Sequence, residues 1–128
     1  MANNDIEEKG YSEVIKHEKK YGREAELVRK DGYDIVSKAK GEIVRRIEVK
    51  STSKSYLNFR WLEEKEYLAF EKYDNFYLYI VTNTENKPVV WEFSKKRLLA
   101  KKMKKVIKYS IPFRKKEFEI QLQTRLLI

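Results

Sequence analysis

The sequence predicts a mixed α/β fold in which helices and strands follow one another in the order αβββαββαβ. Stretches with the apolar periodicity of a helix alternate with short runs in which every second residue is apolar. The pairs Asp31-Gly32 and Lys40-Gly41 are typical of turns and separate three early strands. Residues Phe76 to Thr82 are almost continuously apolar, which indicates a central strand covered on both faces.

The residues at their ends help to place the individual elements. We expect a first helix between Ser12, as its N-cap, and Gly22, just past its end, and further helices over residues 62–73 and 94–105. We expect strands over residues 23–29, 33–37, 42–51, 76–82, 89–93 and 118–122. A chain of 128 residues with 41% hydrophobic content can fill one core, so residues 1–128 are predicted to form a single domain.

The composition excludes several kinds of chemistry. The chain has no cysteine and one histidine, which rules out disulfides, thiolate zinc sites, cysteine nucleophiles and an all-histidine zinc site. A metal would therefore be held by oxygen ligands, which favours Mg²⁺, with Mn²⁺ as a substitute. No apolar run is long enough for a membrane span, and the first ten residues are unlike a signal peptide, so we expect a cytoplasmic protein without a membrane partner.

Positive charge is concentrated in one segment. The chain carries a net charge of +9, and residues 94–116 contain eleven Lys and Arg but no acidic residue. Such a segment is typical of a protein that binds nucleic acid, although a solvated helix face is the plainer alternative. The candidate nucleic-acid-binding residues are Lys95, Lys96, Arg97, Lys101, Lys102 and Lys105.

Three ionisable residues are predicted to converge. Alternation along residues 42–51 places Glu48 and Lys50 on one face of a strand, and the short turn before it brings Asp34 close from an antiparallel neighbour. Two carboxylates and a backbone carbonyl can hold Mg²⁺, while a lysine orients water and neutralises charge at a phosphate. The alternative is that Glu48 and Lys50 form only an ion pair.

Two further features have a functional and a structural interpretation. Glu18 falls on the apolar side of the first predicted helix, so its carboxylate should be either paired or functional. Three aromatic residues that follow the candidate site could stack on splayed bases, or they could pack in the core or at a subunit interface. They are Tyr56, Phe59 and Trp61.

Two segments resemble a known superfamily of nucleases. Gly32-Tyr33-Asp34-Ile35-Val36-Ser37 and Arg46-Ile47-Glu48-Val49-Lys50 are similar to the PD-(D/E)XK motif, and within that superfamily the likeness is to the NO VEIN C-terminal domain family. Leu62 to Val81 extends the resemblance, which covers about residues 11–93. One departure is that Tyr33, not a proline, precedes Asp34.

The resemblance implies a restriction-endonuclease-like αβββαβ core, a mixed central sheet flanked by helices, followed here by a basic helix and a strand. It also implies that Asp34, Glu48 and the carbonyl of Val49 are metal ligands and that Lys50 is the catalytic lysine. Glu18 matches the helix acid that many members add.

The function expected from these features is that of a Mg²⁺-dependent DNA endonuclease. A Holliday-junction resolvase and a catalytically inactive nucleic-acid-binding module of the same fold are the alternatives. Because two sites are needed to cut two strands, a homodimer is possible.

Overall fold

The computed structural model describes residues 3–58 and 60–126. Helices and strands follow one another in nearly the predicted order. They are α1 (Asn3–Lys20), β1 (Glu24–Lys30), β2 (Tyr33–Ala39), β3 (Glu42–Ser51), α2 (Glu64–Lys72), β4 (Phe76–Thr82), β5 (Val89–Ser94), α3 (Lys95–Ala100) and α4 (Lys115–Leu126).

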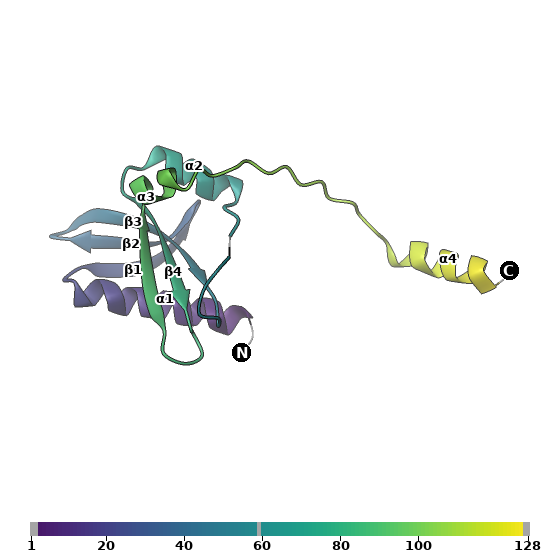
Figure 1. The fold of residues 1–128 in the computed structure, drawn as a ribbon, viewed down its shortest axis with the longest axis horizontal. Coiled ribbons are helices and arrows are strands. Elements are labelled where there is room, and N and C mark those ends of the chain that lie inside the picture. Colours follow the sequence, from purple (N-terminus) through teal and green to yellow (C-terminus); the bar gives the residue numbers. More distant parts are fainter. Residues whose placement is uncertain (1–2, 59, 127–128) are drawn as a thin grey trace.

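The five strands form one mixed sheet in the order β1-β2-β3-β4-β5 (Figure 1). Neighbouring strands are antiparallel except β3 and β4, which run parallel. Parallel neighbours need a crossover connection, and the segment that contains α2 provides it. The fold is therefore a mixed α/β fold, as predicted.

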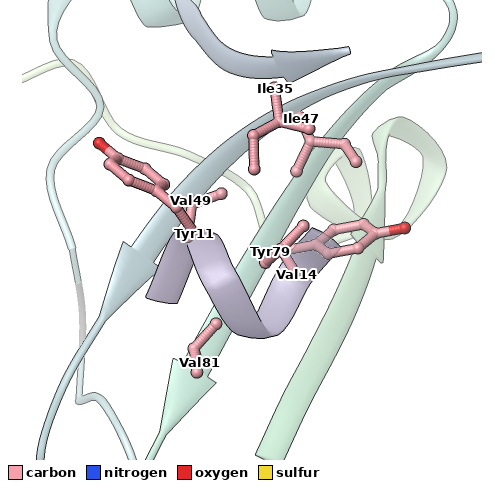
Figure 2. Close-up of a cluster of buried hydrophobic side chains, with 7 residues drawn as sticks. All are labelled: Tyr11, Val14, Ile35, Ile47, Val49, Tyr79 and Val81. Atoms are coloured by element: carbon pink, nitrogen blue, oxygen red, sulfur yellow. The ribbon is translucent and has the colours of Figure 1, made fainter. Parts of the chain in front are cut away.

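Helices cover both faces of the sheet, and each face has its own core. Figure 2 shows the first, in which α1 packs on the sheet through Tyr11 and Val14, against Ile35, Ile47 and Tyr79 among others. The second core lies on the opposite face and contains residues of α2, β4 and α3. Its buried members are Ala69, Phe70, Phe76, Leu78 and Leu98. This double cover explains why the sequence of β4 is almost continuously apolar.

Helix α1 is longer than predicted. It begins at Asn3, not at Ser12, so the expected N-cap lies inside the helix. Asp5 lies in the first turn, where a negative charge is stabilised by the helix dipole. On the longer helix, the stripe that contains Tyr11, Val14 and Glu18 begins with Glu7, which lies before the predicted start of the helix.

The prediction for the C-terminal part of the chain was wrong in two respects. Helix α3 ends at Ala100, not at residue 105, where a run of lysines would place like charges one helical turn apart. The alternating segment 118–122 belongs to helix α4 and is not a strand. A strand needs a neighbour for its backbone groups, whereas a helix satisfies them internally. No sheet strand in the described part of the chain pairs with this segment.

The chain leaves the sheet after α3. Residues 102–114 form neither helix nor strand and lead to α4, which lies away from the rest of the molecule (Figure 1). The residues around the sheet, 3–100, thus make up the compact part of the described chain. None of the described helices is both long and apolar enough to cross a membrane.

Packing of α2 against the turn between β1 and β2 depends on Gly32. Its φ is +96°, and an added Cβ would lie 2.4 Å from the carbonyl oxygen of Lys65 and 2.6 Å from the Cβ of Ala69. Gly22 also has a positive φ, of +78°, but an added Cβ would lie in open space.

We expect Gly32→Ala to lower the free energy of unfolding by about 3 kcal/mol or more, because it adds a clash to the backbone strain. Gly22→Ala is the matched control and should cost about 1 kcal/mol, from strain alone. Urea denaturation measures both. Equal losses in the two variants would contradict the close approach of α2 to Gly32.

Candidate functional site

Pairing of β2 with β3 brings Asp34 and Glu48 together. Ile35 pairs with Ile47 in an antiparallel arrangement, so Asp34, one residue earlier on β2, lies opposite Glu48, one residue later on β3. The backbone N–H of Val49 donates a 2.9 Å hydrogen bond to Oδ2 of Asp34. Glu48 is only 4% exposed. The convergence of these two carboxylates, expected from strand alternation, is present in the structure.

Lys50 joins the pair, held by a residue that the sequence analysis did not single out. Its Nζ lies 3.1 Å from Oε2 of Glu48 and 3.0 Å from Oε1 of Glu66, in the first turn of α2. The same Oε1 of Glu66 accepts a 3.0 Å hydrogen bond from the backbone N–H of Glu63. The spacing Glu63-x-x-Glu66 before a helix indicates the second bond. The first bond depends on how α2 packs on the sheet, which no sequence pattern showed.

The surroundings shift the protonation of this cluster. Burial, followed by the negative charge of Asp34, raises the pKa of Glu48 to about 9, although Lys50 opposes the shift. Burial also raises the pKa of Asp34, against the hydrogen bond from Val49. The pKa of Lys50 is raised as well, because attraction to Glu48 and Glu66 outweighs its desolvation. Two adjacent carboxyls that resist ionising together form a site that a cation would stabilise.

The carboxylates open into an acidic cleft of about 530 Å³ between α1, the β1–β2 turn and α2. Its acidic lining residues are Glu7, Glu8, Asp34, Glu48, Glu63 and Glu66, and its basic ones are Arg29, Lys30 and Lys65. Glu7 reaches it because α1 begins so early. The hydroxyl of Tyr11 donates a 2.5 Å hydrogen bond to Oε1 of Glu7. Glu7 was not among the predicted site residues, because the first helix was expected to begin at Ser12, nine residues after the observed start of α1.

The structure does not bring Glu18 to this cleft, which corrects the expectation that it is the helix acid of the site. Glu18 lies three helical turns beyond Glu7, fully buried on the α1 face of the sheet. Arg23 donates to both of its oxygens, at 2.7 and 2.9 Å, and the hydroxyl of Tyr79 donates at 2.9 Å. Burial disfavours the charged carboxylate, but these hydrogen bonds prevail and lower the pKa of Glu18. Its role is that of a paired structural charge.

Glu18 also belongs to a second cluster of ionisable side chains, with His17 and Glu92. His17, Glu18 and Glu92 each place a ligand atom within 4.8 Å of the others. Glu92 accepts a 2.5 Å hydrogen bond from Arg45 and lies 2.6 Å from Nε2 of His17. With Arg23 on Glu18, both carboxylates already have a cationic partner. We therefore interpret this group as an ion-pair network that fastens α1 to the sheet.

The candidate nucleic-acid-binding residues differ in their contacts with the rest of the protein. Lys95 donates to the backbone carbonyl of Glu71 at 3.0 Å and so binds the C-terminal end of α2, where a cation is favoured. Arg97 and Lys101 lie over the ring of Phe93. The other three candidates, Lys96, Lys102 and Lys105, have exposed side chains.

The aromatic candidates differ in how much the structure reveals about them. Tyr56 and Trp61 are 63% and 46% exposed, and the ammonium of Lys108 lies 4.0 Å from the centre of the Trp61 ring. Neither ring is part of the buried core. Phe59 lies outside the described residues.

The chain matches a family of known proteins. The sequence model of the family described as "Protein NO VEIN, C-terminal" matches residues 6–93, well over half of the chain. No curated protein matches the chain, and no solved structure matches it either. The matched range covers α1 from residue 6 onward, β1 to β4, α2 and β5 up to residue 93, and it ends before α3.

The raised pKa of Glu48 predicts how stability varies with pH in the absence of metal. The folded protein retains a proton that the unfolded chain releases between about pH 4.5 and about pH 9, so the free energy of unfolding should fall as pH rises through that window. Glu48→Gln is neutral at every pH and lacks this loss. In EDTA we expect it to be more stable than the wild type at pH 9, by about 1 to 3 kcal/mol, and about equally stable near pH 4.5.

Urea unfolding midpoints at several pH values test this expectation. Glu42→Gln is the matched control, because Glu42 lies on the same strand but is exposed, and it should not change the pH profile. A Glu48→Gln profile parallel to that of the wild type would show that Glu48 is ionised in the folded protein.

Proposed function

This chain belongs to the family of the NO VEIN C-terminal domain, and we propose that it is a divalent-metal-dependent DNA endonuclease with its active site at Asp34, Glu48 and Lys50. The observation that carries the proposal is the pair of buried carboxyls on neighbouring strands, with a lysine two residues beyond the second one. Simple structural ion pairs do not require two adjacent carboxyls, each with a raised pKa, at the wall of a cleft.

The topology supports a PD-(D/E)XK assignment. The order α1-β1-β2-β3-α2-β4, with β3 and β4 parallel, agrees with the αβββαβ core of restriction-endonuclease-like proteins. The acid-acid-lysine set lies on β2 and β3, as that assignment requires. Among the described residues, β5 is the strand beyond this core, and it extends the sheet on the far side of β4.

The donor set fits Mg²⁺. The ligands would be the carboxylates of Asp34 and Glu48 and the backbone carbonyl of Val49, which are the hard oxygen donors that this ion prefers. Mn²⁺ would be accepted for the same reason. When bound, such an ion polarises a phosphodiester and lowers the pKa of a water molecule. Burial and the negative charge of Asp34 hold the pKa of Glu48 near 9, and a bound cation would favour the ionised carboxylate.

Lys50 would act on the phosphate. Glu48 and Glu66 hold its ammonium at 3.1 and 3.0 Å, and the raised pKa keeps it charged at neutral pH. From this position it would donate to a non-bridging phosphate oxygen and stabilise the charge that builds up in the transition state. Glu66 has a positioning role, because it fixes Lys50 from the opposite side and is itself fixed by the backbone of Glu63.

Glu7 is our candidate for the helix acid. Its carboxylate lines the cleft opposite α2 and accepts the hydrogen bond of Tyr11. In this position it could hold a water molecule on the side of the cleft away from Lys50. The assignment replaces Glu18, which is occupied by Arg23.

DNA is the proposed substrate because of the exposed cations next to the compact domain. The cleft itself is acidic and would repel a phosphate group unless metal ions were bound in it. Lys96, Lys102 and Lys105 could contact the phosphate backbone outside the cleft. Tyr56 and Trp61 offer exposed rings for stacking on unpaired bases.

An inactive nucleic-acid-binding module is the second candidate, and one observation favours it. Lys50 already has two carboxylate partners, so the cluster satisfies itself as an ion-pair group. In that case the protein would bind DNA with an affinity that falls with salt but would not cut it.

Cleavage assays separate the two candidates. Supercoiled plasmid, linear duplex, single strand and four-way junction are each incubated with Mg²⁺, Mn²⁺ or EDTA. We expect metal-dependent cutting, and Glu48→Gln should reduce its rate by about 100-fold or more, because a ligand and its charge are lost. Glu42→Gln should cut at the wild-type rate. Preference for the junction would indicate a resolvase.

Salt-sensitive binding without cutting in either metal would replace the nuclease with the binding module. Full activity of Glu48→Gln would remove the proposed site altogether.

Glu7 and Glu18 should have opposite effects when each is changed to Gln. Glu7→Gln should slow cleavage by about 10-fold or more with little effect on stability, since Glu7 lies at the edge of the cleft. Glu18→Gln should lower the free energy of unfolding by about 3 kcal/mol, because the half-buried Arg23 loses its charged partner. Plasmid cleavage and urea denaturation of both variants test this. A slower cleavage rate in a fully folded Glu18→Gln protein would restore Glu18 to the site.

A further inference from the structure

The last part of the chain, residues 101–126, exposes many apolar side chains, and we call it the C-terminal arm. In its extended part, Ile107, Tyr109, Ile111 and Phe113 are 67%, 87%, 70% and 66% exposed. Helix α4 adds exposed side chains at Phe118, Ile120 and Leu122. Figure 1 shows the arm running away from the sheet. Apolar surface of this extent is typical of a region that another surface covers.

The surface area of the chain supports the same conclusion. The chain exposes 10235 Å². A compact protein of 15.5 kDa would expose about 7,200 Å² by the usual scaling. The excess of about 3,000 Å² per chain is enough for a stable homodimer, since such interfaces bury about 2,000 to 5,000 Å² in total.

The extended part of the arm has the pattern of a strand. Ile107, Tyr109, Ile111 and Phe113 alternate with other residues, so in an extended backbone they share one face. Their N–H and C=O groups also point to one common side. Pro112 lacks an N–H and has the opposite parity, which suits a strand whose other side faces solvent. The arm could therefore join a sheet as a new edge strand.

The sheet of this protein has two open edges, and they differ in their protection. The β1 edge carries an exposed Leu27, at 38%, but also exposed Glu24 and Glu26, and charges of this kind discourage a further strand. The β5 edge carries exposed apolar residues, Val89 at 39% and Trp91 at 49%. Val89 and Trp91 alternate along β5, so they offer an apolar face beside which the apolar face of the arm would continue.

We propose that the arm of one chain adds as a strand to the β5 edge of a second copy, and that the second copy reciprocates. The arm is directed away from its own sheet, so another chain offers the accessible edge (Figure 1). Pairing of two arms with each other is disfavoured, because residues 101–116 carry eight Lys and Arg and no acidic residue. Reciprocal exchange gives a closed dimer with two-fold symmetry.

The first test is the mass of the full chain in solution, by light scattering and sedimentation. We expect twice the 15.5 kDa chain mass, and we expect it to persist in about 1 M NaCl, where bridging by nucleic acid is screened. Ile111→Glu should weaken dimerisation by about 100-fold, since it places a charge in the apolar face. Ser110→Glu is the matched control, with the same charge on the neighbouring residue of the opposite face, and it should remain a dimer.

The second test shows which surface the arm binds. The chain has no cysteine, so Tyr109→Cys and Val89→Cys each introduce a unique thiol. After the two variants are mixed, a short bismaleimide should link them as a heterodimer, whereas Tyr109→Cys alone should give little linked product. A monomer at every concentration, a dimer seen only with nucleic acid, or a dimer without links from arm to β5 would each overturn the proposal.

Discussion

The pairing of β2 with β3 is the constraint on which the rest of the structure depends. With Ile35 opposite Ile47, alternate residues of both strands enter the core under α1, and Asp34 and Glu48 meet beside α2. A slip of one residue would exchange the two faces and bury charge in place of the isoleucines. The hydrophobic core and the candidate site are therefore fixed by the same register. The backbone of Val49 reinforces it by holding the carboxylate of Asp34.

Helix α1 carries two glutamates on one face, Glu7 and Glu18, and they have different surroundings. Its first turns bring Glu7 to the cleft, while its last turn buries Glu18 beside Arg23 and Tyr79. Between them, Tyr11 and Val14 pack on the sheet (Figure 2). The buried ion pair holds the far end of the helix in place and so keeps the near end at the cleft. A helix acid and a structural acid look alike in sequence, because both repeat with the same period as the apolar residues.

The basic segment, residues 94–116, carries both positively charged and apolar side chains. Lys95 binds the end of α2, whereas the cations of the C-terminal arm are exposed, and two of them, Lys101 and Lys108, lie over aromatic rings. The arm combines those cations with an alternating apolar face, and each property suggests a different partner. In the proposals made above, the cations serve nucleic acid and the apolar face serves a second copy of the chain. The two uses are compatible, because alternate residues of an extended chain point in opposite directions.

The sequence by itself determined the five strands described above, the central position of β4, and the meeting of Asp34, Glu48 and Lys50. These features follow from local alternation, turn residues and composition, which act over a few residues. Only the tertiary structure decided that Glu66 holds Lys50, that Glu7 and not Glu18 reaches the cleft, and that residues 118–122 lie in a helix. Each of these features depends on where a helix begins or ends, or on which helices and strands are in contact. Such contacts arise between residues far apart in the chain. Alternation predicted a strand at 118–122, but a strand forms only where a neighbouring edge can accept its hydrogen bonds.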